Sequence, residues 1–433
     1  MRETVRPCAL LEGDLSLPGD KSISHRAALF NACAHGRATV THFSPGADCL
    51  STLACLRALG ASIESMSAED GSLRLVVQGQ GADALREPEN VLDAGNSGTT
   101  TRLFSGLLAS RPFLSVMTGD SSLRSRPMGR VIAPLRQMGA QIWARKGDTL
   151  APLVIRGGGL KGIRYRMPVA SAQVKSAILI AGLFAEGETE VEEPAPTRDH
   201  TERMFRAMGA HVRTDGPRVT VRPGRLQAVD VDVPGDISAA AFWLVAAAIH
   251  PDARIRIRNV GVNPSRTGVL DVLRAMGARV RLEDQREVGG EPVADIVAES
   301  SQLQATEIGG DLVPRAIDEI PILALAAAVA RGATTIRNAE ELRVKESDRI
   351  RTITQELGRM GVRIEERPDG MVIHGGAHLR GAACQSHGDH RLAMTVAVAG
   401  LVARGETTIE DAEAASVSYT SFWQDLRRLA RSS

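Results

Sequence analysis

Short apolar stretches recur along the chain, and each follows a polar loop. A helix that is apolar on every side belongs in a buried core. The pattern therefore predicts six buried helices whose N-terminal ends carry polar loops. The six copies are GDKSISHRAALFNACA from Gly19, GNSGTTTRLFSGLLA from Gly95, ASAQVKSAILIAGL from Ala170, GDISAAAFWLVAAAI from Gly235, IDEIPILALAAAVA from Ile317 and GDHRLAMTVAVAGLVA from Gly388.

A second phrase, of the form Leu-Arg-x-Met-Gly-Ala-x-Val, recurs in step with the first. It predicts the last turn of a helix, a glycine in the left-handed conformation and then a strand. The chain ends in DLRRLARSS, which resembles a further helix end, and we expect no strand after it. The glycines of the five copies are Gly60, Gly139, Gly209, Gly277 and Gly361.

Strand-like segments lie between the helices, and they are alternating or β-branched, as in RATVTHF, LRLVVQG, RIRIRNV and GMVIHGG. Six units of about 70 residues then account for the chain. Six such units exceed one hydrophobic core, which favours two lobes of three units in an α/β fold. We expect residues 19–234 to form one lobe, and residues 1–18 together with 235–433 to form the other.

Composition narrows the classes of function. The 433 residues include 52 basic and 51 acidic side chains, for a net charge of +1, and only 3% are aromatic, which argues against a nucleic-acid partner. The longest apolar runs, 239–249 and 320–330, have 11 residues and are too short to span a bilayer. Five cysteines without a CxxC pair are typical of free thiols in a reducing compartment, so we expect a cytoplasmic protein.

Lysine is rare among the basic residues. A lysine retained in an arginine-rich chain can indicate a need for a compact, rotatable ammonium group. Chance explains two of the lysines, Lys146 and Lys161, which lie in turn-like stretches. The other three lie in dense polar motifs, which favours a functional role. The five lysines among the 52 basic residues are Lys21, Lys146, Lys161, Lys175 and Lys345.

Cations gather at the predicted helix starts, where backbone N–H groups and the helix dipole already favour anions. The pattern indicates a small, highly anionic substrate. The alternative is that each arginine pairs with a surface carboxylate. The cations in and between these loops are Lys21, Arg26, Arg102, Arg124, Arg126, Lys175, Arg198, Lys345, Arg349 and Arg391.

Carboxylates near these cations offer acid–base chemistry. Asp318 and Glu346 are the candidates, and the alternatives are a helix N-cap for Asp318 and a surface ion pair for Glu346. The chain has no GxxxxGK[ST] phosphate loop, no HExxH motif and no Cys/His spacing suited to zinc. We therefore expect a transferase that acts on phosphorylated substrates without a cofactor or metal ion.

Eight motifs together carry a family resemblance that covers essentially the whole chain. In chain order they are PGDKSISHR, GNSGTTTR, SLRSRPMGR, ASAQVKSA, TRDHTERM, AIDEIPILA, ELRVKESDR and GDHRLAM. The chain resembles the family of 5-enolpyruvylshikimate-3-phosphate (EPSP) synthases. The resemblance implies a two-lobed inside-out α/β barrel of six βαβαββ repeats, with helix N-termini toward an inter-lobe cleft that holds the active site.

The resemblance also implies an activity, in which phosphoenolpyruvate gives its enolpyruvyl group to the 5-hydroxyl of shikimate 3-phosphate. No cofactor or metal ion is needed, the partners are these two small molecules, and we expect a monomer. The implied catalytic residues are Asp318 as proton acceptor, Glu346 as proton donor, and Lys21. The residues implied for shikimate 3-phosphate are Lys21, Ser22, Arg26, Ser171, Gln173, Arg198, Asp318 and Lys345. Those implied for phosphoenolpyruvate are Lys21, Asn96, Gly98, Arg126, Gln173, Arg349 and Arg391.

Some positions depart from the better-known branch of the family. Ala172 stands where that branch has a second serine, which shifts the expected phosphate contact to Arg198. Val417 stands where some members place a lysine, and Thr420 where proline is usual. These features resemble the family's second class, known for glyphosate tolerance. Gly98, however, keeps the glycine that tolerant members often replace by alanine.

Two alternatives are weighed against this prediction. A sister enzyme transfers the same enolpyruvyl group to UDP-N-acetylglucosamine, and it uses a cysteine in the loop before its Arg-Pro. The corresponding loop here, Gly119–Pro127, contains no cysteine. The other alternative is a non-catalytic repeat protein that binds anions, which would release no phosphate from the two substrates.

Overall fold

The computed structural model describes residues 1–431, which form two compact units. The N-terminal unit comprises Gly19–Val233 and the short turn Val288–Glu291. The C-terminal unit comprises Met1–Pro18, Pro234–Glu287 and the chain from Pro292 onward. Within the described residues, no helix combines the length and hydropathy needed to cross a membrane.

The N-terminal unit contains three sheets with one shared plan. The strand orders are β14-β3-β5-β4, β6-β7-β9-β8 and β10-β11-β13-β12, and in each the first pair is parallel and the other two are antiparallel. The strands are β3 (His35–Phe43), β4 (Ser62–Ser67), β5 (Leu73–Gln80), β6 (Leu92–Asp93), β7 (Leu114–Thr118), β8 (Gln141–Ala144), β9 (Leu150–Arg156), β10 (Arg164–Arg166), β11 (Thr189–Glu192), β12 (Val212–Asp215), β13 (Arg218–Val221) and β14 (Val231–Asp232). The helices are α1 (Lys21–Cys33), α2 (Ala47–Ala58), α3 (Gly98–Ala109), α4 (Gly129–Gln137), α5 (Arg145–Asp148), α6 (Ala172–Leu183) and α7 (His200–Ala207), with short 3₁₀ turns η1 (Ala82–Ala84) and η2 (Leu123–Ser125).

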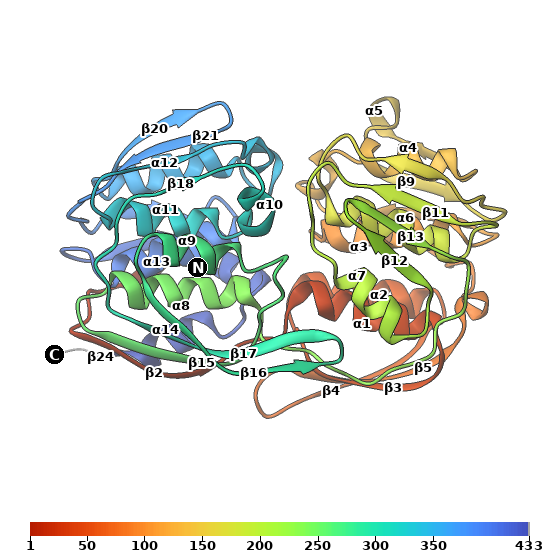
Figure 1. Ribbon diagram of the computed structural model, residues 1–433, viewed down its shortest axis with the longest axis horizontal. Helices are drawn as coiled ribbons and strands as arrows, with labels where there is room; N and C mark the ends of the chain where they lie inside the picture. Colours follow the sequence, from red (N-terminus) through yellow and green to blue (C-terminus); the bar gives the residue numbers. More distant parts are fainter. Residues whose placement is uncertain (432–433) are drawn as a thin grey trace. The chain divides into compact units, whose positions relative to one another are not determined.

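The C-terminal unit follows the same plan with more variation. Its sheets have the orders β18-β19-β21-β20, β16-β17-β15-β2-β24 and β1-β23-β22. The strands are β1 (Glu3–Val5), β2 (Leu10–Ser16), β15 (Ala253–Gly261), β16 (Arg279–Val288), β17 (Glu291–Glu299), β18 (Glu307–Ile308), β19 (Ala333–Ile336), β20 (Arg363–Arg367), β21 (Gly370–His374), β22 (Ala383–Gln385), β23 (Thr407–Glu410) and β24 (Ala430–Arg431). The helices are α8 (Ile237–Ile249), α9 (Gly268–Ala275), α10 (Leu312–Ala316), α11 (Ile320–Val329), α12 (Arg349–Arg359), α13 (His390–Gly400) and α14 (Phe422–Leu429), with 3₁₀ turns η3 (Glu340–Val344) and η4 (Ala412–Val417). Figure 1 shows β2, β15, β16 and β17 along one side of this unit.

The predicted helices and their stop signals are confirmed. The six apolar stretches form α1, α3, α6, α8, α11 and α13, and in α8 every residue from Ile237 to Ala248 is buried. Each of the five phrase glycines has a positive φ and stands between a helix and a strand, as at Gly60 (φ 85°) between α2 and β4. Glycine adopts this left-handed conformation without the steric cost that a Cβ brings.

The end of the chain differs from the expectation. We expected no strand after the last helix, and this is wrong, because Ala430–Arg431 form β24 and pair antiparallel with β2. Ala430 lies opposite Leu11, while the other side of β2 pairs with β15. The two-residue strand therefore covers part of an edge that β2 would otherwise leave unpaired.

Helices α3 and α6 approach closely in the N-terminal unit (Figure 1), and Gly106 makes this approach possible. A Cβ built on Gly106 would lie 2.2 Å from the carbonyl oxygen of Ala177, which is backbone and has little freedom to move. The contact explains why the apolar stretch of α3 contains a glycine despite its low helix propensity.

We expect Gly106→Ala to lower the free energy of unfolding by about 2 kcal/mol or more, because overpacking forces two helices apart. The matched control is Gly358→Ala in α12, where a Cβ meets nothing within 4 Å and the residue is exposed. Helix propensity alone should stabilise that variant by up to about 1 kcal/mol. Urea unfolding of both variants measures the difference, and equal effects would contradict the packing argument.

Candidate active site

The first turn of α1 carries the candidate residues Lys21, Ser22 and Arg26, here named the α1 cluster. Asp20 caps the helix by accepting the N–H of Ile23 at 2.9 Å, which sets where the helix begins. Lys21 Nζ donates to Asp48 Oδ2 at 3.1 Å, and the Lys21 side chain is 22% exposed. The lysine is therefore anchored at one side while remaining accessible to a ligand.

Arg26 is buried with neutral hydrogen-bond partners. Its Nε donates to Thr201 Oγ1 and its NH2 to Ser176 Oγ, both at 2.7 Å, while NH1 donates to the carbonyl of Ser22 at 3.0 Å. Burial lowers the pKa of Arg26 to about 10, and the positive charge of Arg198 acts in the same direction. The group stays cationic at neutral pH, and the two guanidinium groups lie within electrostatic reach of each other. Such a pair suits a phosphate.

A second set of candidates surrounds the start of α3. These residues, Asn96, Gly98, Arg126 and Gln173, are here named the α3 cluster. Arg126 NH1 donates to the carbonyl of Asn96 at 3.1 Å, and the Asn96 amide donates to Asp120 Oδ2 at 2.6 Å. Gln173 Nε2, at the start of α6, donates to Thr99 Oγ1 at 2.9 Å. The contact joins the first turns of α3 and α6.

Two further candidates of the N-terminal unit stand at helix starts. Ser171 is the N-cap of α6, and its hydroxyl accepts the N–H of Val174 at 3.4 Å. A hydroxyl can accept and donate at once, so this cap is compatible with a bond from Ser171 to a ligand. Arg198 lies in the loop between β11 and α7.

Gly98 has little space for a side chain. A Cβ at this position would lie 2.6 Å from Arg102 NH1 and 3.4 Å from Arg126 NH1. Arg102 NH1 in turn donates to Gln173 Oε1 at 2.8 Å, so a methyl group would disturb the contact between these two side chains.

On the roles that the family resemblance implies, we expect Gly98→Ala to raise the KM for phosphoenolpyruvate by about tenfold, because the added methyl group displaces Arg102 and crowds Arg126. The affinity for shikimate 3-phosphate should change less than this, since Gln173 is disturbed but the α1 cluster keeps its contacts. Steady-state kinetics with each substrate varied in turn measures both values. Equal losses for the two substrates would contradict a local effect at the α3 cluster.

The candidate residues of the C-terminal unit gather around Arg349. Its Nε donates to Asp389 Oδ2 at 2.8 Å and its NH2 to Glu346 Oε2 at 2.6 Å, while NH1 is 3.4 Å from Asp318 Oδ1. Burial opposes its charge, but the charges of Asp389 and Glu346 outweigh burial and raise the pKa of Arg349. Burial likewise opposes ionisation of Asp389, yet Arg349 dominates and lowers its pKa. We name Asp318, Glu346, Arg349, Asp389 and Arg391 the carboxylate cluster.

Asp318 faces three guanidinium groups. Besides Arg349, its Oδ2 lies 3.9 Å from Arg266 NH1 and 3.9 Å from Arg391 NH2. The N-cap position of α11 belongs to Glu319, so the alternative reading of Asp318 as a helix cap is wrong. The ion pair expected for Glu346 exists, but its partner is only 3% exposed and the pair is not a surface one. Lys345 precedes Glu346 directly, between η3 and α12.

Sequence reasoning missed Arg266 in this unit. Its NH2 donates to Asp236 Oδ1 at 3.1 Å and to Ser238 Oγ at 2.8 Å, and Ser238 Oγ donates to Glu319 Oε1. These contacts join the first turns of α8 and α11. The available signal was the polar NPSRTG loop before α9, which resembles the other motif loops in composition.

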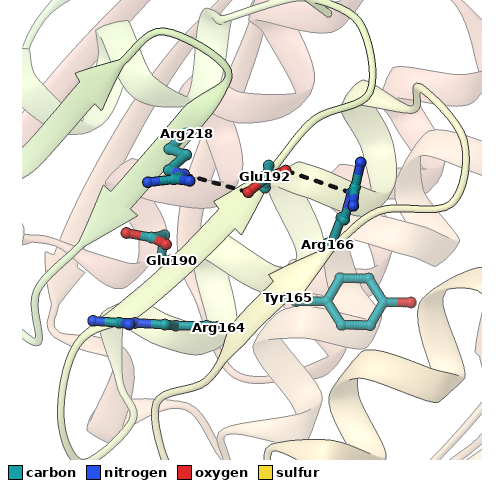
Figure 2. Close-up of a pocket in the computed structure, with 6 residues that line it drawn as sticks. All are labelled: Arg164, Tyr165, Arg166, Glu190, Glu192 and Arg218. Atoms are coloured by element: carbon teal, nitrogen blue, oxygen red, sulfur yellow. Dashed lines mark hydrogen bonds and ion pairs between the residues drawn. The ribbon is translucent and has the colours of Figure 1, made fainter.

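One expectation about the cations is wrong. The ammonium group of Lys175 does not face an open site, because the side chain is 1% exposed and its Nζ contacts Glu193 and Glu202. A separate pocket of about 250 Å³ lies on β10, β11 and β13 and contains none of the candidate residues. Figure 2 shows Arg166 and Arg218 of that pocket on either side of Glu192, which pairs with both.

Comparisons with known proteins agree over nearly the whole chain. Residues 5–426 match the family model of EPSP synthase (3-phosphoshikimate 1-carboxyvinyltransferase). The chain is 54% identical over 428 residues to the 3-phosphoshikimate 1-carboxyvinyltransferase of Herpetosiphon aurantiacus, and 56% identical over 429 residues to that of Gloeobacter violaceus, with 98% of each chain covered. A solved structure of EPSP synthase from Acinetobacter baumannii superposes with a TM-score of 0.88 at 45% identity, covering 100% of this chain and 98% of that one.

Proposed function

The chain belongs to the family of EPSP synthases, and on that premise we propose that the clusters of its two units supply the residues that bind both substrates. The enzyme transfers the enolpyruvyl group of phosphoenolpyruvate to the 5-hydroxyl of shikimate 3-phosphate and releases phosphate, in the biosynthesis of aromatic amino acids. The comparisons support this reaction over the transfer to a UDP-sugar. The residue roles that follow are part of the proposal.

Shikimate 3-phosphate binds through the α1 cluster and its neighbours. Arg26 and Arg198 take the 3-phosphate, with the hydroxyl groups of Ser22 and Ser171 as further donors. The neutral partners of Arg26 and the proximity of Arg198 support this role, because charge that is not consumed by a bound carboxylate is available to an anion. Gln173 lies against the shikimate ring.

Phosphoenolpyruvate binds through Asn96, Gly98 and Arg126 of the α3 cluster, together with Gln173 and Lys21. Arg349 and Arg391 contribute from the carboxylate cluster. Guanidinium groups bind carboxylate and phosphate through two parallel hydrogen bonds, so a set of three arginines suits a substrate that carries both groups. The residues proposed for each substrate are found in both units of the chain.

The carboxylates of the C-terminal unit move the protons. Glu346 donates a proton to the methylene carbon of phosphoenolpyruvate, and the adjacent carbon becomes electrophilic. The 5-oxygen attacks that carbon while Asp318 accepts its proton and Lys345 holds the shikimate side. In the tetrahedral intermediate the bond to phosphate breaks, the departing phosphate takes the proton from Asp318, and the methyl group returns a proton to Glu346. Cations around the departing phosphate supply electrostatic stabilisation, and the ordered reactants supply proximity.

The ion pair between Glu346 and Arg349 favours the ionised carboxylate, which is the wrong form for a proton donor. An incoming substrate anion competes for the same guanidinium group. Once displaced, Glu346 stands beside a negative charge, and this favours its protonated form. Binding of phosphoenolpyruvate thus prepares the proton that the first step requires.

We also propose a monomer in the cytoplasm. All five cysteines are free thiols and four of them are buried. Burial raises the pKa of Cys33 and Cys55 to about 12, which keeps these groups in the unreactive thiol form. Thiols of this kind fit a reducing compartment.

The observation that carries the assignment is the single guanidinium group of Arg349, which holds Asp318 and Glu346 together. A phosphate-release assay tests the proposal. We expect turnover with phosphoenolpyruvate and shikimate 3-phosphate, and none when UDP-N-acetylglucosamine replaces shikimate 3-phosphate. If phosphate is released only with the UDP-sugar as acceptor, the alternative enzyme is the correct assignment. If it is released with neither acceptor, the chain is a protein that binds anions without catalysis.

A further inference from the structure

Lys175 lies in a buried ion network of the N-terminal unit. Its Nζ is 2.6 Å from Glu202 Oε1 and 2.9 Å from Glu193 Oε2, and the side chain is only 1% exposed. Burial opposes its charge, but the two carboxylates outweigh burial and raise the pKa of Lys175. The lysine is therefore charged, and it joins three elements: α6, the end of β11 and the first turn of α7.

The two glutamates bracket the loop that carries Arg198. Glu193 follows β11 directly, and Glu202 lies in α7. Within the loop, Thr197 Oγ1 donates to Glu193 Oε1, and the Thr197 carbonyl accepts a hydrogen bond from Lys175 Nζ at 3.5 Å. One ammonium group thus reaches both ends of the loop and the residue that precedes Arg198.

The same network reaches Arg26. Thr201, which accepts the Nε hydrogen bond of Arg26, is the neighbour of Glu202 in the first turn of α7. The negative charge of Glu202 also opposes the burial that lowers the pKa of Arg26. Lys175 pairs with both buried carboxylates, and the charge of Glu202 also acts on Arg26, so a change at Lys175 alters the field at Arg26.

We propose that Lys175 is a positioning residue for the 3-phosphate site, which it acts on through Glu193, Glu202 and Thr197 without contacting the substrate. The proposal rests on the proposed function, in which Arg26 and Arg198 bind that phosphate. The positioning role also explains why an arginine-rich chain has a lysine at position 175. A compact ammonium fits between two carboxylates and a carbonyl, whereas the larger planar guanidinium group has its donors in a fixed fork.

Thr197→Val is the variant that tests the proposal with least risk to folding. It removes the hydrogen bond from Thr197 to Glu193 but leaves every charge in place. We expect the Kd for shikimate 3-phosphate to rise about tenfold, as for the loss of one hydrogen bond to a charged group. The KM for phosphoenolpyruvate, measured at saturating shikimate 3-phosphate, should stay within about twofold.

Thr189→Val is the matched control. Thr189 is also buried, lies on β11 of the same unit, and has an Oγ1 without a hydrogen-bond partner among the described residues. The same substitution there should leave both substrate constants unchanged. A rise in the Kd for shikimate 3-phosphate in both variants would indicate a general loosening of the unit and overturn the proposal.

Lys175→Met and Lys175→Arg extend the test. Methionine leaves two buried carboxylates without their ammonium, and we expect a loss of shikimate 3-phosphate affinity of about a hundredfold if the variant folds. Arginine keeps the positive charge but not the compact shape of lysine. Lys175→Arg should therefore regain less than about a tenth of the affinity that Lys175→Met loses. Full recovery by arginine would show that charge alone is needed and would contradict a positioning role.

Calorimetric titration of wild type, Thr197→Val, Thr189→Val and Arg198→Gln with shikimate 3-phosphate tests the phosphate site and the role of Lys175 separately. If Arg198→Gln binds as tightly as wild type, the proposed phosphate site is wrong, and the role of Lys175 is wrong with it. If Arg198→Gln is impaired while Thr197→Val binds like wild type, the site stands and only the role of Lys175 is overturned. Impairment of both, with an unchanged Thr189→Val, supports the proposal.

Discussion

Glu346→Gln is expected to lower kcat by about a thousandfold, within the range that a lost general acid produces. Glutamine keeps the size of the side chain and an oxygen that can accept from Arg349, whose NH2 lies 2.6 Å from Glu346 Oε2. The geometry of the carboxylate cluster should therefore persist, while the transferable proton is lost. Single-turnover kinetics and calorimetric titration with shikimate 3-phosphate measure the loss in rate and the affinity, which should stay within about threefold of wild type.

The control for this variant is Glu340→Gln, an exposed residue at the start of η3. It removes the same charge from the same segment, and its kcat should match that of wild type. If Glu346→Gln loses affinity and turnover to the same extent, Glu346 serves in binding rather than in proton transfer. A kcat close to wild type would exclude Glu346 as the donor.

Lys21→Met has the second largest expected effect, a rise of at least about tenfold in the KM for each substrate. Lys21 is assigned to both substrates, and its ammonium group is held by Asp48 at the first turn of α1. Methionine preserves the length of the apolar stem and removes only the charge and its donors. Initial rates over a grid of both substrate concentrations give the two constants.

Asp48→Asn tests whether substrate binding needs the ammonium group of Lys21 itself or its ion pair with Asp48. It breaks the same ion pair but leaves the ammonium group available, so we expect both KM values to stay within about threefold of wild type. If Asp48→Asn and Lys21→Met weaken binding alike, the pair matters for local structure and not for substrate contact. An effect of Lys21→Met on one substrate alone would show that the lysine does not bridge the two.

The helix stops could be predicted from the sequence, and the strand pair between the two ends of the described chain could not. Gly60 and its four counterparts were predictable because a left-handed helix stop depends on a few neighbouring residues. The pairing of β24 with β2 was missed because it joins Leu11 to Ala430 across nearly the whole chain, and no local pattern marks it. A two-residue strand also carries too few residues to show any alternation.

The candidate site was likewise predicted from the sequence only in part. The residues that carry the family motifs were named from the sequence, and the structure places Asp318, Glu346 and Arg349 in contact. The role of Lys175 was misjudged because the sequence motif shows that a cation is present but not whether its partner is a ligand or a carboxylate of the protein. Arg266 was missed for the converse reason, since its partners include Ser238 of α8 and Asp318, which lies two residues before α11. Tertiary contacts decide both cases.

The strands β1 and β2 have a consequence for the order of events during synthesis. The ribosome makes them before their partners β15, β23 and β24, which emerge more than 230 residues later. The segment Gly19–Val233 leaves the ribosome as one continuous stretch and can form contacts within itself in the meantime, before Val288–Glu291 of the same unit is made. Residues 1–18 therefore stay without their native strand partners until β15 is made for β2 and β23 is made for β1.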